Sequence, residues 1–445
     1  MNKKSVYVVT LGCSKNEVDS ELMLGILNKE HYYVAERLET ANIIIVNTCG
    51  FIESAKEESI DSIWEMTKFK EEGVCEFLLL SGCLAQRYSE ELLSEIQDVD
   101  AIIGTGNIKD LNNILGNLDN KERVIKIDNL NSDYLEGVNR ANNSLTAYVR
   151  ISEGCDNFCS YCIIPKLRGK HRSRKMEDII LEVQGLTKNG VKEIVLIAQN
   201  TTDYGKDLYG KYALAELLNK INNIYGVKWI RILYLYPDNI NDELVKAIKE
   251  NDKVVKYLDI PLQHINDNVL KLMNRKTNRA RINSIINKLR GEIPEIVIRT
   301  TFIVGFPGER EEDFKELYDF VRDKKFDKLG VFSYSREEGT SAYNLNNQID
   351  DNIKEKRKDR LMKLQQEISE QLLANKIGET YETLIEEKTD DNIYIGRTYM
   401  DNKEIDGVVY ITSKKELNLD EFYNVNIIDS LEYDLIGVLE DELSE

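Results

Sequence analysis

The sequence contains little cysteine and no long apolar run. Seven of the 445 residues are cysteine, the chain opens with the polar segment Met1–Lys4, and no apolar stretch reaches the length of a bilayer-spanning helix. No apolar core of a secretory signal peptide follows that start. These absences argue against a membrane protein and against a disulfide-rich secreted domain. We therefore expect a cytoplasmic chain, in which disulfides are rare.

Histidine and positive charge are also scarce. The three histidines are scattered and form no spaced metal-binding pair, so we interpret them as structural; they are His31, His171 and His264. The chain carries 59 Lys and Arg against 78 Asp and Glu, and its net charge of −19 disfavours a general attraction to nucleic acid or anionic lipid. Residues 376–445 alone hold six basic and 19 acidic residues, a net −13. That segment is either a solubilising surface or a docking face for a basic partner.

The first third of the chain repeats one unit. A length of 445 residues predicts two or three domains. Apolar runs at 5–10, 41–46 and 76–80 are each followed by a cysteine and an amphipathic helical pattern. The three cysteines are Cys13, Cys49 and Cys83, spaced 36 and 34 residues apart. Alternating strands and helices predict a parallel sheet, and its carboxyl edge would carry all three thiols.

Two interpretations remain for this first triplet. Any one of these cysteines, taken alone, is typical of a buried and inert side chain at a strand end. Three in one repeated context predict a metal cluster with three protein ligands and one open position. Cys75 stands at the head of a strand rather than at its end, and we assign it no ligand role.

A second triplet, Cys155, Cys159 and Cys162, forms a CxxxCxxC spacing within one short loop. Structural zinc sites and one-cluster ferredoxins use four protein ligands, so three thiolates leave one metal position open. An open iron of a 4Fe-4S cluster can bind S-adenosylmethionine and break a carbon–sulfur bond with one electron, which yields a deoxyadenosyl radical. The alternative is a set of buried apolar cysteines or a disulfide, and the density of the three on a polar loop argues against it.

A second series of strands and helices follows a polar stretch, rich in Asn and Asp, that runs from about 118 to 141 and predicts a connection between domains. Six apolar runs separated by helical patterns predict a partial, open TIM-like (β/α)6 barrel whose active face is built by the loops after the strands. The six runs are 147–152, 193–198, 229–234, 257–260, 297–303 and 328–333.

Loops on that face supply the candidate binding residues for S-adenosylmethionine, because the CxxxCxxC loop follows the first of the six strands. Glycine lets a backbone approach a ligand closely, so we include a turn after the fifth strand. These candidates are Gln199, Asn200, Gln263, Gly305 and Pro307. Three arginines follow the cluster loop and either offset negative charge at the cluster or form an exposed basic stretch. They are Arg168, Arg172 and Arg174.

The last part of the chain predicts a third fold. A charged helical run at 353–375 leads to short alternating runs, which predict a small antiparallel β-barrel of a kind that commonly binds polymers. The runs are 382–387, 392–397, 407–411 and 423–428.

This combination resembles the radical S-adenosylmethionine methylthiotransferase family over nearly the whole chain. The resemblance implies an α/β chain with an auxiliary-cluster domain over 1–118, a radical core over 141–372 and a TRAM-type barrel over 375–441. It also implies two 4Fe-4S clusters. The first would be held by Cys13, Cys49 and Cys83, and the second, which cleaves S-adenosylmethionine, by Cys155, Cys159 and Cys162.

Two branches of this family modify different substrates. One thiomethylates an adenosine beside the tRNA anticodon, and the other, called RimO, thiomethylates the β-carbon of an aspartate in ribosomal protein S-twelve. Residues 47–60, 259–264 and 397–407 are similar to the RimO branch. Small departures from the family pattern are Arg310, after the turn at 305–309, and Asn402 and Lys403 within the last segment. The acidic C-terminal segment also favours a basic ribosomal protein, free or within the small subunit, over tRNA.

The resemblance implies two uses of S-adenosylmethionine, one as methyl donor to sulfur at the auxiliary cluster and one as the radical source, with the electron supplied by an external donor. Radical attack on an unactivated C–H bond explains why no poised histidine or paired carboxylate is needed. Two alternatives stay open. One is a tRNA methylthiotransferase, and the other is a non-catalytic iron–sulfur electron carrier or ribosome-assembly factor, which would have no use for open irons.

Overall fold

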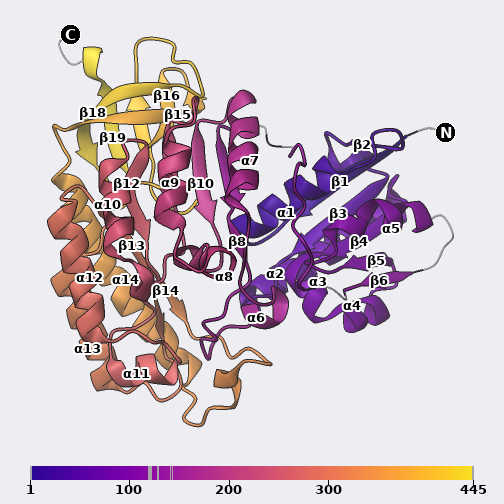
Figure 1. Ribbon diagram of the computed structural model, residues 1–445, viewed down its shortest axis with the longest axis horizontal. Helices are drawn as coiled ribbons and strands as arrows, with labels where there is room; N and C mark the ends of the chain where they lie inside the picture. Colours follow the sequence, from indigo (N-terminus) through magenta and orange to yellow (C-terminus); the bar gives the residue numbers. More distant parts are fainter. Residues whose placement is uncertain (1–2, 119–122, 128–129, 141, 143, 443–445) are drawn as a thin grey trace. The chain divides into compact units, whose positions relative to one another are not determined.

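The chain forms two compact units in a computed structural model that describes residues 3–118, 123–127, 130–140, 142 and 144–442 (Figure 1). Unit 1 takes in residues up to 213 together with 224–226 and 335–343. Unit 2 takes in residues 214–223, 227–334 and those from 344 onward. Within the described ranges, no helix combines the length and the apolar composition that crossing a membrane requires.

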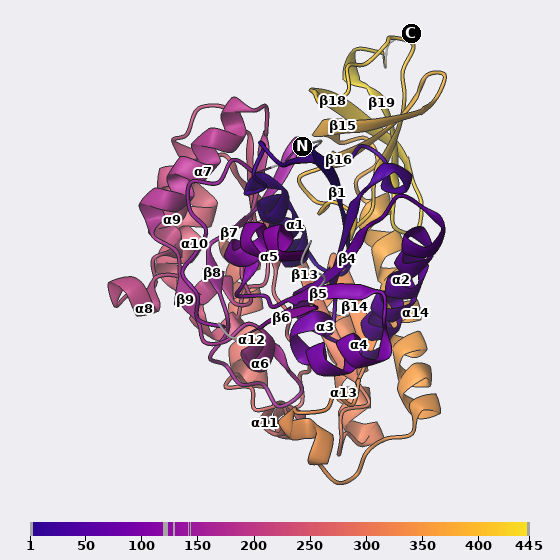
Figure 2. The ribbon, with the colours of Figure 1, turned by 90° about the vertical axis from the view of Figure 1, so that its right-hand side faces the viewer.

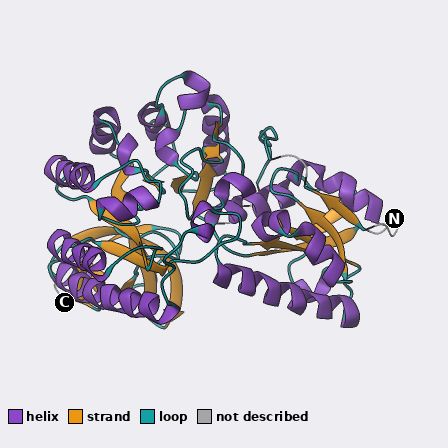
Figure 3. Ribbon diagram, turned by 90° about the horizontal axis from the view of Figure 1, so that it is seen from below, coloured by secondary structure: helices purple, strands orange, loops and turns teal. Residues whose placement is uncertain are grey.

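Unit 1 begins with a six-stranded parallel sheet of order β2-β1-β3-β4-β5-β6 (Figure 2). The three predicted strands are present as β1, β3 and β4. β3 is buried throughout because helices pack on both sides of it (Figure 3). The strands are β1 (Lys4–Thr10), β2 (Tyr32–Val34), β3 (Ile43–Thr48), β4 (Phe77–Ser81), β5 (Val99–Ile103) and β6 (Val124–Lys126).

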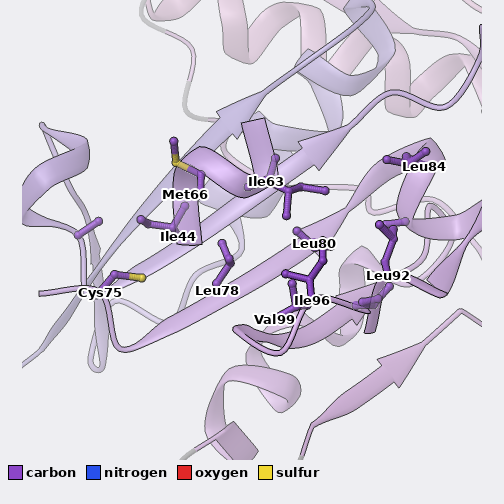
Figure 4. Close-up of a cluster of buried hydrophobic side chains, with 14 of the residues drawn as sticks. Ile44, Ile63, Met66, Cys75, Leu78, Leu80, Leu84, Leu92, Ile96 and Val99 are labelled. Carbon is purple, nitrogen blue, oxygen red and sulfur yellow. The ribbon is translucent and has the colours of Figure 1, made fainter. Parts of the chain in front are cut away.

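Two apolar clusters lie on the two faces of this sheet. One packs α2 onto β3 and β4, and the other packs α1 and α5 onto the opposite face. Cys75 lies in the first cluster with Ile44 and Leu78 (Figure 4), and its thiol donates to the Phe77 carbonyl at 3.4 Å. The helices are α1 (Ser14–Gly25), α2 (Glu53–Glu72), α3 (Gly82–Arg87), α4 (Ser89–Glu95) and α5 (Leu111–Asn117).

All six strands expected after residue 141 are present, in a sheet of order β14-β13-β12-β11-β10-β7. Unit 1 holds β7 (Thr146–Arg150) and β10 (Glu193–Ile197), and unit 2 holds the other four. Those four are β11 (Trp229–Ile232), β12 (Val254–Asp259), β13 (Val297–Val304) and β14 (Lys328–Ser333). The pairings within each unit are parallel, as the predicted barrel requires. A short antiparallel pair, β8 (Ser152–Glu153) and β9 (Arg172–Ser173), flanks the CxxxCxxC loop.

Helices alternate with these strands, and α10, α12 and α13 line one side of β12 and β13 (Figure 1). They are α6 (Ile164–Leu167), α7 (Met176–Lys188), α8 (Lys206–Tyr209), α9 (Leu214–Asn222), α10 (Asp242–Glu250), α11 (Asp267–Leu272), α12 (Arg279–Glu292), α13 (Glu311–Lys324) and α14 (Asp351–Ala374).

The predicted C-terminal barrel is confirmed, with two differences. It is closed in the order β15-β16-β17-β19-β18, so a fifth strand completes it, and β17 pairs with β19 in parallel while the other pairings are antiparallel. Closure removes the exposed edges of the sheet. The strands are β15 (Thr380–Asp390), β16 (Ile393–Thr398), β17 (Val409–Thr412), β18 (Phe422–Ser430) and β19 (Leu435–Leu439).

The segment 397–407 anchors this barrel to the strands of unit 2. Asp401 accepts from Lys328 Nζ at 2.6 Å, and Asp406 accepts from the Tyr257 hydroxyl at 2.7 Å. Arg231 donates to the Tyr399 carbonyl at 2.9 Å. The sequence similarity seen in this segment therefore coincides with a structural anchor.

The polar stretch from 118 to 141 is more than a connection, so that prediction was wrong in part. Residues 119–122, 128–129 and 141 lie outside the described residues, but β6 joins the sheet beside β5. Arg140 is buried, and its guanidinium bonds Glu21 of α1, Glu182 of α7 and the Tyr148 carbonyl. A three-residue strand and a single arginine give too little periodicity to stand out within an Asn-rich and Asp-rich composition.

Candidate functional site

The carboxyl ends of three neighbouring strands bring Cys13, Cys49 and Cys83 together. Thr10, Asn47 and Ser81 are paired in register across β1, β3 and β4. Cys13 follows as the N-cap of α1, Cys49 follows β3 directly, and Cys83 lies in the first turn of α3. Each of the three cysteines therefore follows its aligned strand end by two or three residues.

Two glycines make this approach possible. Gly12 has φ +88°, and a Cβ there would lie 2.9 Å from Cys49 Sγ. Gly82 has φ +89°, and a Cβ there would lie 2.3 Å from the Thr48 carbonyl oxygen. A larger residue at either position would be strained and would push the strand ends apart. Ser59 of α2 further fixes Cys49 by bonding both its backbone N–H and its carbonyl at 2.9 Å.

The three thiols influence one another's pKa values electrostatically. Burial is the main cause that raises the pKa of Cys49 to about 12, and the neighbouring Cys13 and Cys83 contribute to this rise. Burial also raises the pKa of Cys83, while Arg168 opposes that rise and hydrogen-bonds the thiol. Without a metal these two thiols hold their protons. A bound metal supplies the positive charge that releases them.

The second triplet lies on a loop that closes on itself. Cys155 N–H donates to the Gly169 carbonyl at 3.2 Å, and Cys162 N–H donates to the Cys159 carbonyl at 3.0 Å. All three side chains are partly exposed. Burial raises the pKa of Cys155 to about 11, and Cys159 contributes to the rise. Gly154 has φ +75°, and a Cβ there would lie 2.0 Å from the Lys170 carbonyl oxygen, so the loop needs glycine at this point.

Arg168 joins the two triplets within unit 1. It lies six residues after Cys162, its side chain is 2 % exposed, and it donates to Asp19 and to Asn16 at 2.7 Å each. It also bonds Cys83, and Cys83 packs against Ile163 and Leu167 beside the second triplet. Arg168 follows the second triplet in the chain and contributes positive charge beside the first triplet.

Arg168 belongs to a buried network of four charges. Asp19 also accepts from Arg150 at 2.6 Å, and Glu153 lies 2.8 Å from Arg150 and 3.5 Å from Arg168. Burial alone would raise the pKa of Glu153, but the two guanidinium groups lower it. The predicted alternative of an exposed basic stretch is wrong for Arg168 and for Arg174, since Arg174 is buried between Glu136 and Glu182.

The candidate residues of unit 1 for S-adenosylmethionine lie after β10. Gln199 donates to Glu153 at 2.5 Å, and its buried Oε1 has no hydrogen-bond partner among the described residues. Asn200 uses its amide within its own turn, bonding Asp203 at 2.8 Å and Thr202 at 2.6 Å. Gln199 therefore has a free acceptor for a polar ligand, whereas Asn200 shapes the loop.

The candidate residues of unit 2 lie after β12 and β13. Gln263 has φ +71° and bonds Thr301 and Ile303 through its backbone, while its buried Oε1 has no partner among the described residues. Gly305 has φ +72°, and a Cβ there would lie 2.2 Å from Lys354 Cγ. Glu309 braces the turn that contains Pro307, because its carboxylate accepts from Gly305 N–H at 2.6 Å and from Arg357 at 3.1 Å.

The arrangement of thiols fits clusters better than single ions. No three His, Cys, Asp or Glu side chains in the described part of the chain lie close enough together to hold one metal ion. In a cuboidal cluster each cysteine binds a different iron, so the three sulfur atoms need not converge on one point. Two of the thiols are buried and protonated, and a buried arginine lies beside them at the three aligned strand ends. The thiols provide ligands for such a cluster, and the arginine provides the balancing charge.

Comparison with known proteins places this arrangement in a family. Residues 5–104 match the Uncharacterized protein family UPF0004, residues 149–321 match the Radical SAM superfamily, and residues 377–439 match the TRAM domain. The chain is 52% identical over 434 residues to the ribosomal protein uS12 methylthiotransferase RimO of Clostridioides difficile, covering 97% of this chain and 98% of that one. The chain belongs to the RimO family.

Other relatives agree with this assignment. The RimO of Acetivibrio thermocellus is 50% identical over 453 residues and is covered in full by this chain. Among solved structures, the radical S-adenosylmethionine methyltransferase TsrM from Kitasatospora setae, with cobalamin and a [4Fe-4S] cluster bound, has a TM-score of 0.56 at 12% identity over 77% of each chain. That likeness concerns the fold alone. Membership of the Radical SAM superfamily implies a 4Fe-4S cluster and S-adenosylmethionine.

For this RimO-family chain, sequence reasoning missed the residues that support the cysteines. The structure shows three buried supporting residues: Asp19 bonds Arg168, Ser59 bonds Cys49, and Glu309 bonds Gly305. Each of them is an ordinary polar residue within a helical or turn pattern. Helical spacing would have placed Asp19 one turn after Asn16 on the same face of α1, and this was the available signal.

Burial lowers the pKa of His264 to about 3, and its Nδ1 accepts from Asn266 N–H at 3.0 Å.

Proposed function

We propose that this chain adds a methylthio group to the β-carbon of an aspartate in ribosomal protein uS12 and consumes S-adenosylmethionine both as methyl donor and as radical source. The observation that carries the proposal is the placement of Cys13, Cys49 and Cys83 at three aligned strand ends, with Arg168, which follows the CxxxCxxC loop and α6, beside Cys83. Two incompletely ligated clusters in one enzyme suit a reaction that needs both a radical and a sulfur atom.

The chain's own residues hold and orient these groups. Cys155, Cys159 and Cys162 would hold the 4Fe-4S cluster that reduces S-adenosylmethionine, and the strand-end triplet would hold a second, auxiliary cluster. When bound, the first supplies the electron that generates a radical, and the second supplies or carries the sulfur. Arg168 balances the negative charge that the ionised thiols bring into a buried place. The buried amide oxygens of Gln199 in unit 1 and of Gln263 in unit 2 each lack a hydrogen-bond partner among the described residues, and each by itself is a candidate acceptor for a polar group of S-adenosylmethionine.

Charge favours a protein substrate over tRNA. Residues 376–445 carry a net −13, and nucleic-acid affinity depends largely on cationic side chains that neutralise phosphates. A basic ribosomal protein is instead attracted to such a surface. This substrate would place the working enzyme in the cytoplasm, where it also needs an external electron donor.

The three predicted domain ranges, 1–118, 141–372 and 375–441, are proposed as the units of this function. Each range contains one of the matched family segments. The first would hold the auxiliary cluster, the second the radical chemistry and the third the substrate.

Anaerobically reconstituted protein tests the proposal. We expect about eight iron atoms per chain in the wild type and about four in a Cys13→Ala, Cys49→Ala, Cys83→Ala variant, with the Cys75→Ala variant as an unchanged control. The Cys159→Ala variant should lose cleavage of S-adenosylmethionine, and undiminished cleavage would contradict the assignment. Mass spectrometry of uS12 and tRNA offered separately decides the substrate, because a methylthio group found only on tRNA would favour the other branch.

A further inference from the structure

Among the residues that the structure describes, no helix lies over one part of the N-terminal sheet. α2 packs on β3 and β4, and the chain between β2 and β3, residues 35–42, forms only a short 3-10 turn at Leu38–Thr40. A parallel sheet normally carries helices over its whole face. The face of β1 beside α2 is therefore open.

The open face is apolar. Tyr7, Val9 and Leu11 alternate along β1 and its end toward the α2 side, and all three are only partly buried. Leu38 and Met66 lie on the same side of the sheet. Tyr33 of β2 is paired with Ser5 and so shares this face, and it is 51% exposed. Tyr7, Val9, Leu11, Leu38 and Met66 line a groove of about 830 Å³ and form its apolar floor.

The wall of the groove is acidic. α2 lines it with Glu57, Glu58, Asp61 and Glu65, which lie on one side of the helix because they recur at helical spacing. All four side chains are exposed, and none forms an ion pair with a described residue. Lys56, on another side of the same helix, is bound by Glu53 and Glu337. The groove wall therefore presents four carboxylates with no balancing cation.

The groove leads to the first cysteine triplet. Thr10 and Leu11 line it, and Cys13 follows two residues after Leu11. At the same end α2 contributes Ser54, five residues after Cys49. From Ser54 to Glu65 the helix rises about 16 Å, the length of about five residues of extended peptide.

We infer that this groove binds an extended basic segment of the protein substrate and directs it toward the strand ends that carry Cys13 and Cys49. The inference rests on the proposed function, which supplies a basic protein partner. Four unpaired carboxylates beside an apolar floor match alternating basic and apolar side chains. Nucleic acid, an acidic redox partner and a second copy of a chain with a net charge of −19 would all be repelled.

A charge-removing pair of substitutions tests the inference. Glu57→Gln with Asp61→Asn keeps the shape of the groove and removes two charges, and Glu71→Gln with Glu95→Gln removes two exposed charges elsewhere in unit 1. We expect the groove pair to weaken uS12 binding and to raise its KM by about tenfold, with kcat nearly unchanged and a shallower dependence of affinity on salt. The control pair should bind as the wild type does. Iron content and cleavage of S-adenosylmethionine without uS12 should be the same in all three proteins.

The outcomes separate this inference from the proposed function. If the wild type modifies uS12 and the groove pair binds it equally well, the docking inference is wrong and the function stands. If the wild type neither binds nor modifies uS12, both fail. Weaker tRNA binding by the groove pair than by the wild type, or a wild-type dimer that the groove pair dissociates, would also overturn the inference by identifying a different occupant. A photo-crosslinking residue at position 58 that captures uS12, with position 71 as the silent control, would support it directly.

Discussion

Burial sets the reactivity of the cluster cysteines at the scale of single residues. With the pKa of Cys155 near 11, only about one thiol in a thousand is ionised at pH 8, against about a quarter for an ordinary cysteine. We expect iodoacetamide to label Cys155 and Cys49 of the metal-free folded protein at least a hundredfold more slowly at pH 8 than in urea, with rates rising up to about pH 11 for Cys155 and about pH 12 for Cys49. Residue-resolved mass spectrometry measures this. Equal labelling rates in folded and unfolded protein would show that burial does not raise the pKa values of these thiols.

Arg168 should be far more sensitive to substitution than its neighbour Arg172. Arg168→Leu would leave the buried Asp19 with one fewer cation and Cys83 without its donor, and losing one partner of a buried pair costs about 3–5 kcal/mol. Arg168→Lys keeps the charge and should recover part of the loss. Arg172 bonds Asn131 and the Lys170 carbonyl nearer the surface, so Arg172→Leu is the matched control.

Urea denaturation and iron content measure the two effects of Arg168 separately. We expect Arg168→Leu to lower both the stability and the iron retained by Cys13, Cys49 and Cys83. Equal stability and iron loading in Arg168→Leu and Arg172→Leu would show that the buried network does not support the cysteines.

At the scale of elements, the segment before β7 acts as a clasp. Arg140 joins α1 to α7 through Glu21 and Glu182, with the Arg140 side chain 2 % exposed. Arg140→Ala should destabilise the chain by about 3–5 kcal/mol because the buried Glu21 loses its cation and Glu182 keeps only Arg174. Arg37→Ala, at a side chain that is 74% exposed, should change stability by less than about 1 kcal/mol. Urea denaturation monitored by fluorescence measures the free energy of unfolding of the two variants. Similar free energies would show that Arg140 does not hold α1 and α7 together.

Strands with a strong apolar run were predictable, and their neighbours were not. β1, β3 and β4 were expected because four or more consecutive apolar residues in each leave little alternative. β5 was missed because Asp100 interrupts it, and β2 and β6 because three residues give no periodicity. The parallel pairing of β17 with β19 depends on closing a barrel over distant residues, which local pattern does not encode.

The cysteine ligands were predictable from a repeated sequence pattern, whereas the residues that support them were not. A thiol at the end of each repeated strand is visible in the sequence, since strand ends in a parallel sheet meet at one edge. Asp19, Ser59 and Glu309 gain their meaning only from what they touch after folding. The three segments resembling RimO include 397–407, whose contacts with β12 and β14 are those of an anchor rather than a ligand site.

At the scale of the whole molecule, charge is distributed unevenly along the chain. This distribution predicts that binding of the substrate depends on salt. The C-terminal segment carries a net −13 of the total −19. Exposed charges act through solvent over about 14 Å at 50 mM salt and about 4 Å at 500 mM, so this attraction should fade as salt rises. We expect uS12 affinity to drop at least tenfold over that range, while cleavage of S-adenosylmethionine without uS12 stays constant.

Neutralising the barrel should reproduce part of the effect of salt. The exposed barrel residues Glu387, Asp391 and Glu432, changed to Gln, Asn and Gln, should slow association with uS12 by about threefold to tenfold with little change in dissociation. The control changes three exposed glutamates of α10 and α14 to Gln: Glu243, Glu367 and Glu370. Stopped-flow association rates separate the two sets. If both sets slow association equally, the total charge of the chain, rather than its concentration on the barrel, attracts the substrate.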